Sequence, residues 1–138
     1  MDCVFCKIIN GDIPSTKVYE DDIVVAFMDI SQLTSGHLLI VPKKHYKDFL
    51  EIDDETLAHL QKVAKRVAIA MKKALKGCVG FNIINNCGEG AGQAVLHYHL
   101  HIVPRYENDG FVLKGIDHSD NIDFAKLASL ANDIKNNL

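Results

Sequence analysis

The alternation of apolar and polar positions along the chain predicts five short strands and two helices. Residues 17–20 and 23–29 indicate two strands separated by the turn-like pair Asp21–Asp22, and residues 37–42 indicate a third after Thr34-Ser35-Gly36. Two more strands are expected at residues 81–86 and 96–103. The loop between them, residues 87–92, holds three of the nine glycines.

The strongest helical pattern lies between Asp53 and Lys76, where Asp53 is suited to cap the first turn and Gly77 to end the helix. Its apolar positions recur at helical spacing: Leu57, Leu60, Ala64, Val67, Met71 and Leu75. A last helix is expected over residues 122–134. Neighbouring strands joined by short loops favour an antiparallel sheet, so the predicted class is α+β with the helices packed against the sheet.

Composition narrows the picture to one domain, residues 1–138, with an ordinary apolar content of 48%. The net charge of −3 and the scattered basic residues exclude a track for a nucleic-acid backbone. No stretch approaches the roughly 20 apolar residues of a membrane span, and residues 1–7 lack a basic leader. We therefore expect a cytoplasmic protein whose four cysteines bind metal or are buried, and do not form disulfides.

Candidate chemistry is concentrated in the last predicted strand. Alternation places His97, His99 and His101 on one face and Tyr98 and Leu100 on the other. A lone histidine there would most simply be structural, but three at this spacing are typical of a site. The glycine-rich loop just before them can adopt backbone shapes that present N–H groups to an anion.

The segment His97-Tyr98-His99-Leu100-His101-Ile102-Val103 resembles the pattern of the histidine triad (HIT) superfamily, in which three histidines alternate with apolar residues. The resemblance covers residues 3–105, and residues 106–138 look like the helical extension of the bacterial Hit-like branch. Within the superfamily, the chain looks most like Hint and those Hit-like proteins that contain zinc and a Cys-x-x-Cys pair. Further matching segments are Cys3-x-x-Cys6, Ile13-Pro14, Phe27-x-Asp29-Ile30, Gly36-His37, Pro42-Lys43-Lys44-His45, Gly92-Gln93 and Pro104-Arg105.

The resemblance implies a five-stranded antiparallel sheet with a long helix, in a homodimer through which the sheet continues. It also implies cleavage at the α-phosphate of nucleoside phosphoramidates, adenylylated amines or dinucleoside polyphosphates through a covalent nucleotidyl-histidine. Neutral imidazole is a suitable nucleophile near pH 7. Hydrolysis is favoured over transfer because the transferase branch carries Gln where this chain has His101.

Carried over residue by residue, the resemblance makes His99 the nucleophile, with His101 assisting at the phosphate and His37 supporting the histidine cluster. Ala94 departs from members that carry a hydroxyl residue on the leaving-group side. The implied nucleotide contacts are Asp29 for the ribose, Ile30 for the base, and Asn86, Gly92 and Gln93 along the phosphate, with His99 and His101.

A second constellation predicts a metal site. Cys3 and Cys6, with His45 and His97, would form a tetrahedral zinc site if the fold brings them together. Among family members with this cysteine pair, the first triad histidine can be a zinc ligand, so His97 would be structural. We expect this zinc site to have no open coordination position and no catalytic role. We expect no catalytic metal elsewhere.

Two other functions stay open on the sequence alone. The three triad histidines could hold a catalytic zinc that activates water, which predicts metal at His99 and loss of activity on chelation. The chain could instead be a nucleotide-binding regulatory or scaffold protein whose turnover is incidental.

Overall fold

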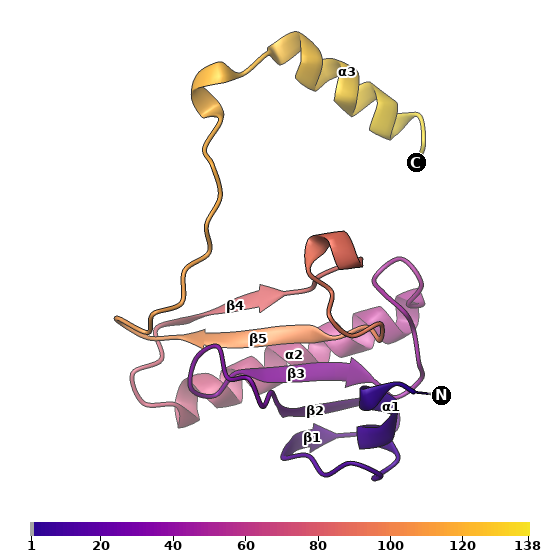
Figure 1. Ribbon diagram of the computed structural model, residues 1–138, viewed down its shortest axis with the longest axis vertical. Coiled ribbons are helices and arrows are strands. Elements are labelled where there is room, and N and C mark those ends of the chain that lie inside the picture. Colours follow the sequence, from indigo (N-terminus) through magenta and orange to yellow (C-terminus); the bar gives the residue numbers. More distant parts are fainter. Residues whose placement is uncertain (1) are drawn as a thin grey trace.

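The computed structural model describes residues 2–138. Its centre is one five-stranded antiparallel sheet with the strand order β1-β2-β3-β5-β4, as expected (Figure 1). The elements are α1 (Val4–Ile9), β1 (Lys17–Glu20), β2 (Val24–Met28), β3 (Leu38–Pro42), α2 (Asp54–Ala74), β4 (Gly80–Ile84), the 3₁₀ turn η1 (Glu89–Ala91), β5 (Leu100–Arg105), the 3₁₀ turn η2 (Ser119–Asn121) and α3 (Phe124–Lys135).

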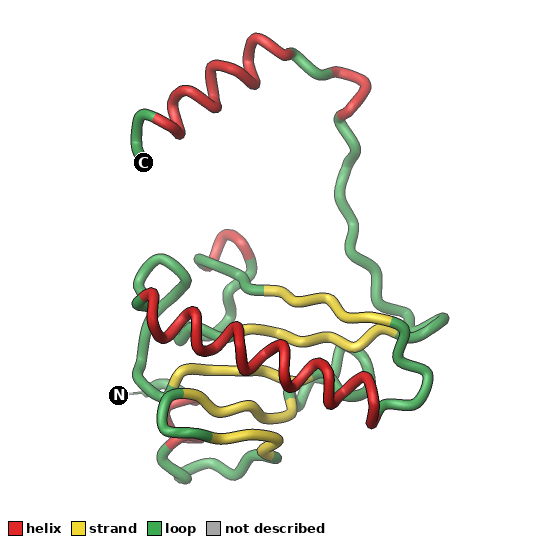
Figure 2. Tube along the Cα trace, turned by 180° about the vertical axis from the view of Figure 1, so that it is seen from behind, coloured by secondary structure: helices red, strands yellow, loops and turns green. Residues whose placement is uncertain are grey.

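The long helix α2 covers one face of the sheet (Figure 2). It begins where predicted, since the Asp53 carboxylate accepts the Thr56 N–H at 2.7 Å. The helix buries Leu60, Val63 and Val67 against the sheet. Alternate strand residues face this side, with Tyr98, Leu100 and Ile102 among them, so the predicted apolar face of the last strand is confirmed.

The opposite face is covered in part by α1, which the sequence pattern did not predict. Phe5 and Ile8 of this short helix are buried against the strand residues that point away from α2. Those residues are Val25, Phe27, Leu39 and Val41. Strands β2 and β3 are therefore apolar on both faces, which explains why their sequences do not alternate cleanly.

The last strand begins later than expected. The prediction was residues 96–103, but β5 starts at Leu100, so His97 and His99 precede the strand. The neighbouring strand β3 ends at Pro42, which has no N–H to donate, and the Pro42 carbonyl accepts from the His97 ring at 2.8 Å. The Tyr98 N–H bonds instead to the Tyr46 carbonyl at 2.7 Å.

The packing expected for the C-terminal helix is wrong. Helix α3 forms close to the predicted position, but it does not pack on the sheet of its own chain, and residues 112–138 are all exposed. Figure 1 shows an extended segment that carries α3 beyond the edge strand β4. Among residues 2–138, every helix is too short or too polar to cross a membrane.

Candidate functional site

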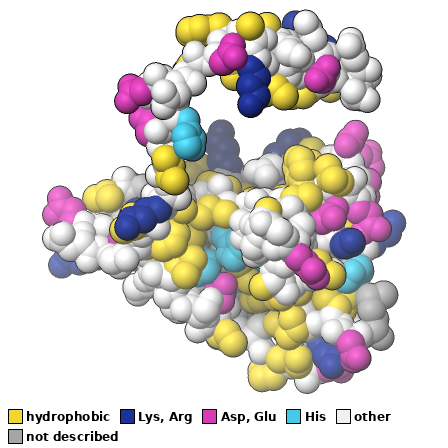
Figure 3. Space-filling view, turned by 45° about the horizontal axis from the view of Figure 1, so that its top comes forward, with side chains coloured by type: hydrophobic (Ala, Val, Ile, Leu, Met, Phe, Trp, Pro, Cys, Tyr) yellow, Lys and Arg dark blue, Asp and Glu magenta, His cyan; other side chains and the backbone are white. Residues whose placement is uncertain are grey.

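A cleft of about 800 Å³ lies between α1 and the sheet. Its walls are mainly apolar, with Phe5 and Ile8 from α1 and Phe27 and Leu39 from the strands. The polar side chains that line it include Asp29, His99 and His101. In Figure 3, histidine side chains are visible at the centre of the body among apolar side chains. An apolar cleft with a few convergent polar groups is the usual form of a small-molecule site.

The proton arrangement of His99 is fixed by its neighbour. Nδ1 of His99 lies 2.8 Å from the His97 carbonyl oxygen, which can only accept a hydrogen bond. Nδ1 therefore carries the proton in the neutral ring, and the lone pair is on Nε2. Burial lowers the pKa of His99 below 6.5, with the hydrogen bond to the His97 carbonyl as a partial offset. The ring is thus held neutral, with one nitrogen free to attack an electrophile.

His101 and His37 form a connected pair next to it. The Leu33 N–H donates to Nδ1 of His37 at 3.2 Å, so the His37 proton is on Nε2. This Nε2 lies 3.0 Å from Nδ1 of His101, which leaves Nε2–H of neutral His101 as a donor. Burial, with the charges of His99 and His37, lowers the pKa of His101 to about 4. The rings of His99 and His101 are adjacent, with centroids 5.0 Å apart.

Asp29 is held as a carboxylate at the end of β2. Its Oδ1 accepts from the backbone N–H and the hydroxyl of Ser31 at 2.8 and 2.7 Å. Burial alone would raise the pKa of Asp29, but the hydrogen bonds from Ser31 outweigh burial and lower it. Oδ2 lies 3.5 Å from Nε2 of His37. The neighbouring Ile30 is fully exposed and also lines the cleft.

Gln93 is buried, with a side chain that braces the glycine-rich loop from within. Its Oε1 accepts the Gly88 N–H at 2.8 Å, and its Nε2 donates to the carbonyls of Lys47 and Val95 at 2.7 and 3.0 Å. All three hydrogen bonds are to backbone groups, so this side chain fixes the path of the chain that leads to the histidines.

Asn86 and Gly92 lie in the same loop but outside the lining of the cleft, as does Gln93. Gly92 has φ +90°, which a side chain would strain, and Asn86 Nδ2 donates to its carbonyl at 3.5 Å. The amides of residues 88 and 91–93 are bonded within the loop, since residues 89–91 form the turn η1. Most of the N–H groups that were expected to bind an anion are therefore already hydrogen-bonded within the loop. The loop contributes Ala94 to the lining of the cleft.

The predicted metal ligands Cys3, Cys6, His45 and His97 do come together. Their donor atoms all lie within 4.8 Å of one another. Nδ1 of His97 is 3.4 Å from Cys3 Sγ, 3.6 Å from Cys6 Sγ and 3.1 Å from His45 Nδ1. Nδ1 of His45 is 3.4 Å from Cys6 Sγ. Because Nε2 of His97 donates to Pro42, its Nδ1 lone pair is the one directed at the cysteines.

This donor set fits zinc. With bonds of about 2.0–2.3 Å, the edges of a tetrahedron measure roughly 3.3–3.8 Å, and the four donor spacings given above, 3.1–3.6 Å, are close to that range. The Cys6 N–H also donates to Cys3 Sγ at 3.4 Å, a contact that stabilises a thiolate. The site could therefore bind an ion whose four coordination positions are all filled by protein, with none left for substrate. The four ligands would be Cys3, Cys6, His45 and His97.

The triad histidines thus divide between two sites. His97 turns its free nitrogen to the cysteines, whereas His99 and His101 face the cleft. Among residues 2–138, no group of potential metal ligands unites these three histidines. This geometry does not support a catalytic zinc on the triad.

The wall of the cleft that α1 supplies was not predictable as a part of the site. Phe5 packs edge-on against the rings of His97 and His99, with centroids 5.8 and 5.1 Å apart. The sequence signal for this wall was a short run of apolar residues at helical spacing next to the cysteine pair: Val4, Phe5, Ile8 and Ile9.

Comparison with known proteins identifies the family. The HIT domain family matches residues 10–108, which is more than half of the 138 residues. The chain therefore belongs to the HIT family.

Three curated relatives are similar to this chain over three quarters of its length or more. "Protein hit" of Bacillus subtilis is 44% identical over 99% of this chain and 94% of its own length. "Adenosine 5'-monophosphoramidase hnt1" of Schizosaccharomyces pombe is 39% identical over 76% of this chain and 75% of its own length. "Adenylylsulfatase HINT3" of Arabidopsis thaliana is 43% identical over 78% of this chain and 54% of its own length. The last two are named as hydrolases.

Solved structures extend the similarity to the whole chain. A HIT family protein from Bacillus subtilis, 44% identical, superposes with a TM-score of 0.94 over 100% of this chain and 98% of its own. If residues 112–138 took another course there, the remaining 111 of 138 residues would limit that score to about 0.80. The C-terminal segment therefore runs alike in both. A Zn-bound histidine triad family protein from Mycobacterium smegmatis, 38% identical, has a TM-score of 0.77 over 87% of each chain.

Proposed function

We propose that this protein is a nucleotide hydrolase that cleaves at the α-phosphate of nucleoside phosphoramidates, adenylylated amines or dinucleoside polyphosphates through a covalent nucleotidyl-histidine. The observation that carries the proposal is the hydrogen bond from Nδ1 of His99 to the His97 carbonyl, 2.8 Å, in a buried ring that lines the cleft. It leaves Nε2 unprotonated and poorly solvated, which are the properties of an activated nitrogen nucleophile.

The reaction proceeds in two displacements at phosphorus. In the first, Nε2 of His99 forms a bond to the α-phosphorus while the bond to the leaving group breaks. In the second, water attacks the phosphorus and releases a nucleoside monophosphate and the free ring. Covalent catalysis replaces one difficult step by two easier ones. Ala94 offers no hydroxyl to the leaving group, so substrates whose leaving group readily takes a proton from water are favoured.

The other site residues bind and orient the substrate. Nε2–H of His101, held by the bond from His37 to its Nδ1, donates to a non-bridging oxygen of the phosphate. Asp29 accepts from the ribose hydroxyls, and Ile30 packs against the base. Asn86, Gly92 and Gln93, which lie outside the lining of the cleft, act on the phosphate indirectly, through the loop backbone whose path they fix.

The metal site is structural in this proposal. Cys3, Cys6, His45 and His97 hold one zinc ion, which supplies folding free energy and no catalysis. The thiolates require a reducing compartment such as the cytoplasm.

We further propose that the protein is a two-fold homodimer. The edge strand β4 leaves one row of backbone groups unpaired, and pairing with a second copy would satisfy them. The substrate is a small nucleotide, and neither nucleic acid nor a membrane is a partner.

The test is His99→Asn, which keeps polarity and approximate size but removes the nucleophile. With an adenosine phosphoramidate, turnover should fall by about a thousandfold or more, whereas AMP binding measured by calorimetry should largely persist. Acid-free quenching of the wild-type reaction, followed by intact mass measurement and peptide mapping, should find the adduct on His99.

His59→Asn on helix α2 is the matched control, because His59 pairs with Asp21 on the other face of the sheet, and it should retain turnover. An adduct on any other residue, or near-normal turnover in His99→Asn, would overturn the mechanism. Stoichiometric release without turnover in the wild type would favour a binding protein.

A further inference from the structure

The C-terminal arm, residues 112–138, is exposed along its whole length although it is rich in apolar side chains. It runs from the end of β5 past the edge strand β4 and places α3 away from the body (Figures 1 and 3). Nine large apolar residues of the arm are exposed: Val112, Leu113, Ile116, Ile122, Phe124, Leu127, Leu130, Ile134 and Leu138. An exposed apolar surface of this extent marks an interaction site.

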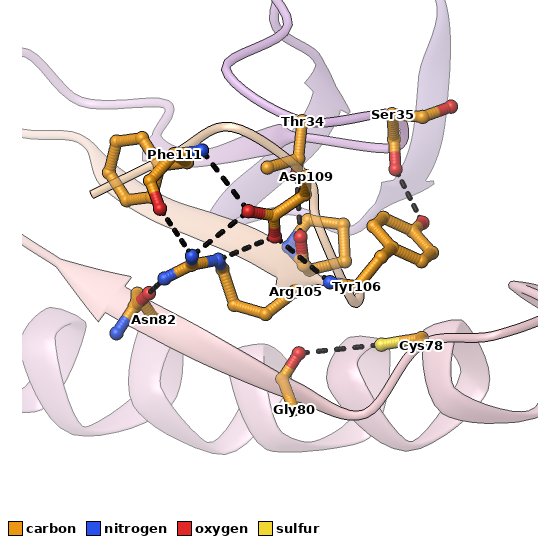
Figure 4. Close-up of polar contacts among 10 residues, drawn as sticks. Thr34, Ser35, Cys78, Gly80, Asn82, Arg105, Tyr106, Asp109 and Phe111 are labelled. Carbon is orange, nitrogen blue, oxygen red and sulfur yellow. Dashed lines mark hydrogen bonds and ion pairs between the residues drawn. The ribbon is translucent and has the colours of Figure 1, made fainter.

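The root of the arm is fixed by a network around Arg105, so its direction is set by the sheet (Figure 4). Nε and Nη2 of Arg105 donate to the two carboxylate oxygens of Asp109 at 2.8 and 3.0 Å. Nη1 donates to the Asn82 side chain of β4 at 2.7 Å, and Nη2 also bonds the Phe111 carbonyl. Beside this network, the Tyr106 hydroxyl donates to the Ser35 carbonyl. The chain therefore leaves the body at Phe111 in a direction that the side chains of Arg105 and Asp109 hold.

Helix α3 is built to bury one face. Its first turn is capped by Asp123, which accepts the Lys126 N–H at 3.1 Å. Phe124, Leu127, Leu130 and Ile134 recur at helical spacing on one side. A helix of 12 residues is marginal by itself in water, so this one needs a surface for that face.

We propose that the arm is exchanged between two copies of this chain, so that the apolar face of α3 in each copy packs against the other copy. The inference rests on the homodimer of the proposed function but not on its chemistry. A second copy that continues the sheet at β4 lies on the side of the body toward which the arm projects. Val79 and Ile83, at that edge, are 64% and 49% exposed. The related crystal structure in which the arm runs alike shows that this extended course is not peculiar to one sequence.

The area involved is sufficient for a stable dimer. At roughly 100 Å² of apolar surface for each large side chain, the nine residues of one arm offer on the order of 900 Å². A stable interface buries about 800 Å² per partner. In a two-fold exchange each copy contributes one arm, so the area of one arm is the quantity to compare.

The first test is photo-crosslinking of the full chain with zinc bound. Leu130→p-benzoylphenylalanine places the probe on the apolar face of α3, and Ser129→p-benzoylphenylalanine places it on the opposite face. The protein is diluted to a concentration at which sedimentation still shows one discrete species. Irradiation of the Leu130 variant should then yield a covalent product of twice the 15.3-kDa chain mass. The Ser129 variant should yield several-fold less. A product of single-chain mass with an internal crosslink would overturn the proposal.

The second test changes the face without a probe. Leu127→Asp with Leu130→Asp should raise the dimer dissociation constant at least tenfold, whereas Ser129→Asp with Asn132→Asp adds equal charge on the other face and should leave it within about twofold. An equal effect in both pairs would contradict exchange. So would wild-type binding to phosphatidylglycerol vesicles that the first pair abolishes while the dimer is unchanged.

These outcomes separate the proposals. A wild-type monomer in sedimentation would reject the homodimer and the exchange together, whereas a dimer insensitive to the arm would reject the exchange alone. Phosphoramidate turnover with a His99 adduct would leave the proposed chemistry standing in either case.

Discussion

At the scale of single residues, two carbonyl oxygens determine what the histidines can do. The His97 carbonyl places the proton of His99 on Nδ1, and the Pro42 carbonyl places that of His97 on Nε2. The free nitrogen therefore differs between the two rings, although they are only two residues apart. One ring is presented to the cleft and the other to the cysteines. The same local sequence thus supplies a candidate nucleophile and a candidate metal ligand.

His37 and His101 should make stability depend on pH. Burial lowers the pKa of His37 below 6.5 and that of His101 to about 4. Below pH 6.5 the unfolded chain takes up protons that the folded chain resists. Their contribution to the free energy of unfolding is therefore fully present above pH 6.5 and is lost as the pH falls toward 4. We expect a loss of about 1–2 kcal/mol by pH 5, seen as a Tm lower by several degrees.

The control for this pH dependence is a matched pair of variants. His101→Gln should flatten the fall of Tm between pH 7 and pH 5, and His118→Gln, in the exposed arm, should leave it as in the wild type. Because both variants keep all four metal ligands, loss of zinc in acid affects them equally. Identical slopes in the two variants would contradict the assignment.

The grouping of the metal ligands could be predicted from the sequence, whereas the positions of the loop residues could not. The four metal ligands meet as expected, because their residue types and spacing are specific to one chemistry. Residues of the glycine-rich loop were harder to interpret, since Gln93 faces inward and Asn86 lies outside the lining of the cleft. An amide side chain can bind a ligand or backbone equally well, and only packing decides between them.

At the scale of elements, α1 connects the metal site with the cleft. Its six residues are too few to form a stable helix alone, but Cys3 caps it and Phe5 is packed against His99. The metal ligands thus secure one wall of the nucleotide cleft.

Removing the metal should therefore weaken nucleotide binding as well as stability. The protein as purified should contain about one zinc per chain, as a closed site implies. Chelation or Cys3→Ala should lower Tm and weaken AMP binding about tenfold, because Phe5 and Ile8 lose their fixed place. Cys87→Ala, which changes a loop thiol outside the cluster, should alter neither. Metal-free protein with unchanged AMP affinity would show that the wall stands without the ion.

Helix α2 was predictable because its apolar stripe extends over many turns, and the strands because they alternate or are bounded by turns. Helix α1 was not, since its six residues span fewer than two turns, and four apolar positions over so short a segment (Val4, Phe5, Ile8 and Ile9) do not establish a period. The late start of β5 depends on where β3 ends and on a ring that occupies the Pro42 carbonyl. Such tertiary contacts are not visible in the pattern of one segment.

At the scale of the whole molecule, the sequence predicted that α3 forms but not where it packs. An amphipathic pattern shows that a helix buries one face, and it does not distinguish a surface of the same chain from one of a second copy. In the expected fold α3 covered its own sheet. The network at its root instead directs it past β4.

That network should control assembly without contributing to the core. Asp109 is the residue to change, because it accepts from Arg105, from the N–H of Tyr106 and from the N–H of Phe111. Asp109→Ala frees the arm to take many directions, so the entropy of ordering it is added to association and the dimer dissociation constant should rise about tenfold. Asp109→Asn keeps an acceptor oxygen for one of the two backbone N–H groups and should have a smaller effect, whereas Asp117→Ala, within the exposed arm, should have none. Sedimentation gives the constants and Tm at a fixed subunit concentration gives the stability. If all three variants dimerise like the wild type, the root does not aim the arm, and exchange would have to depend on the apolar face of α3 alone.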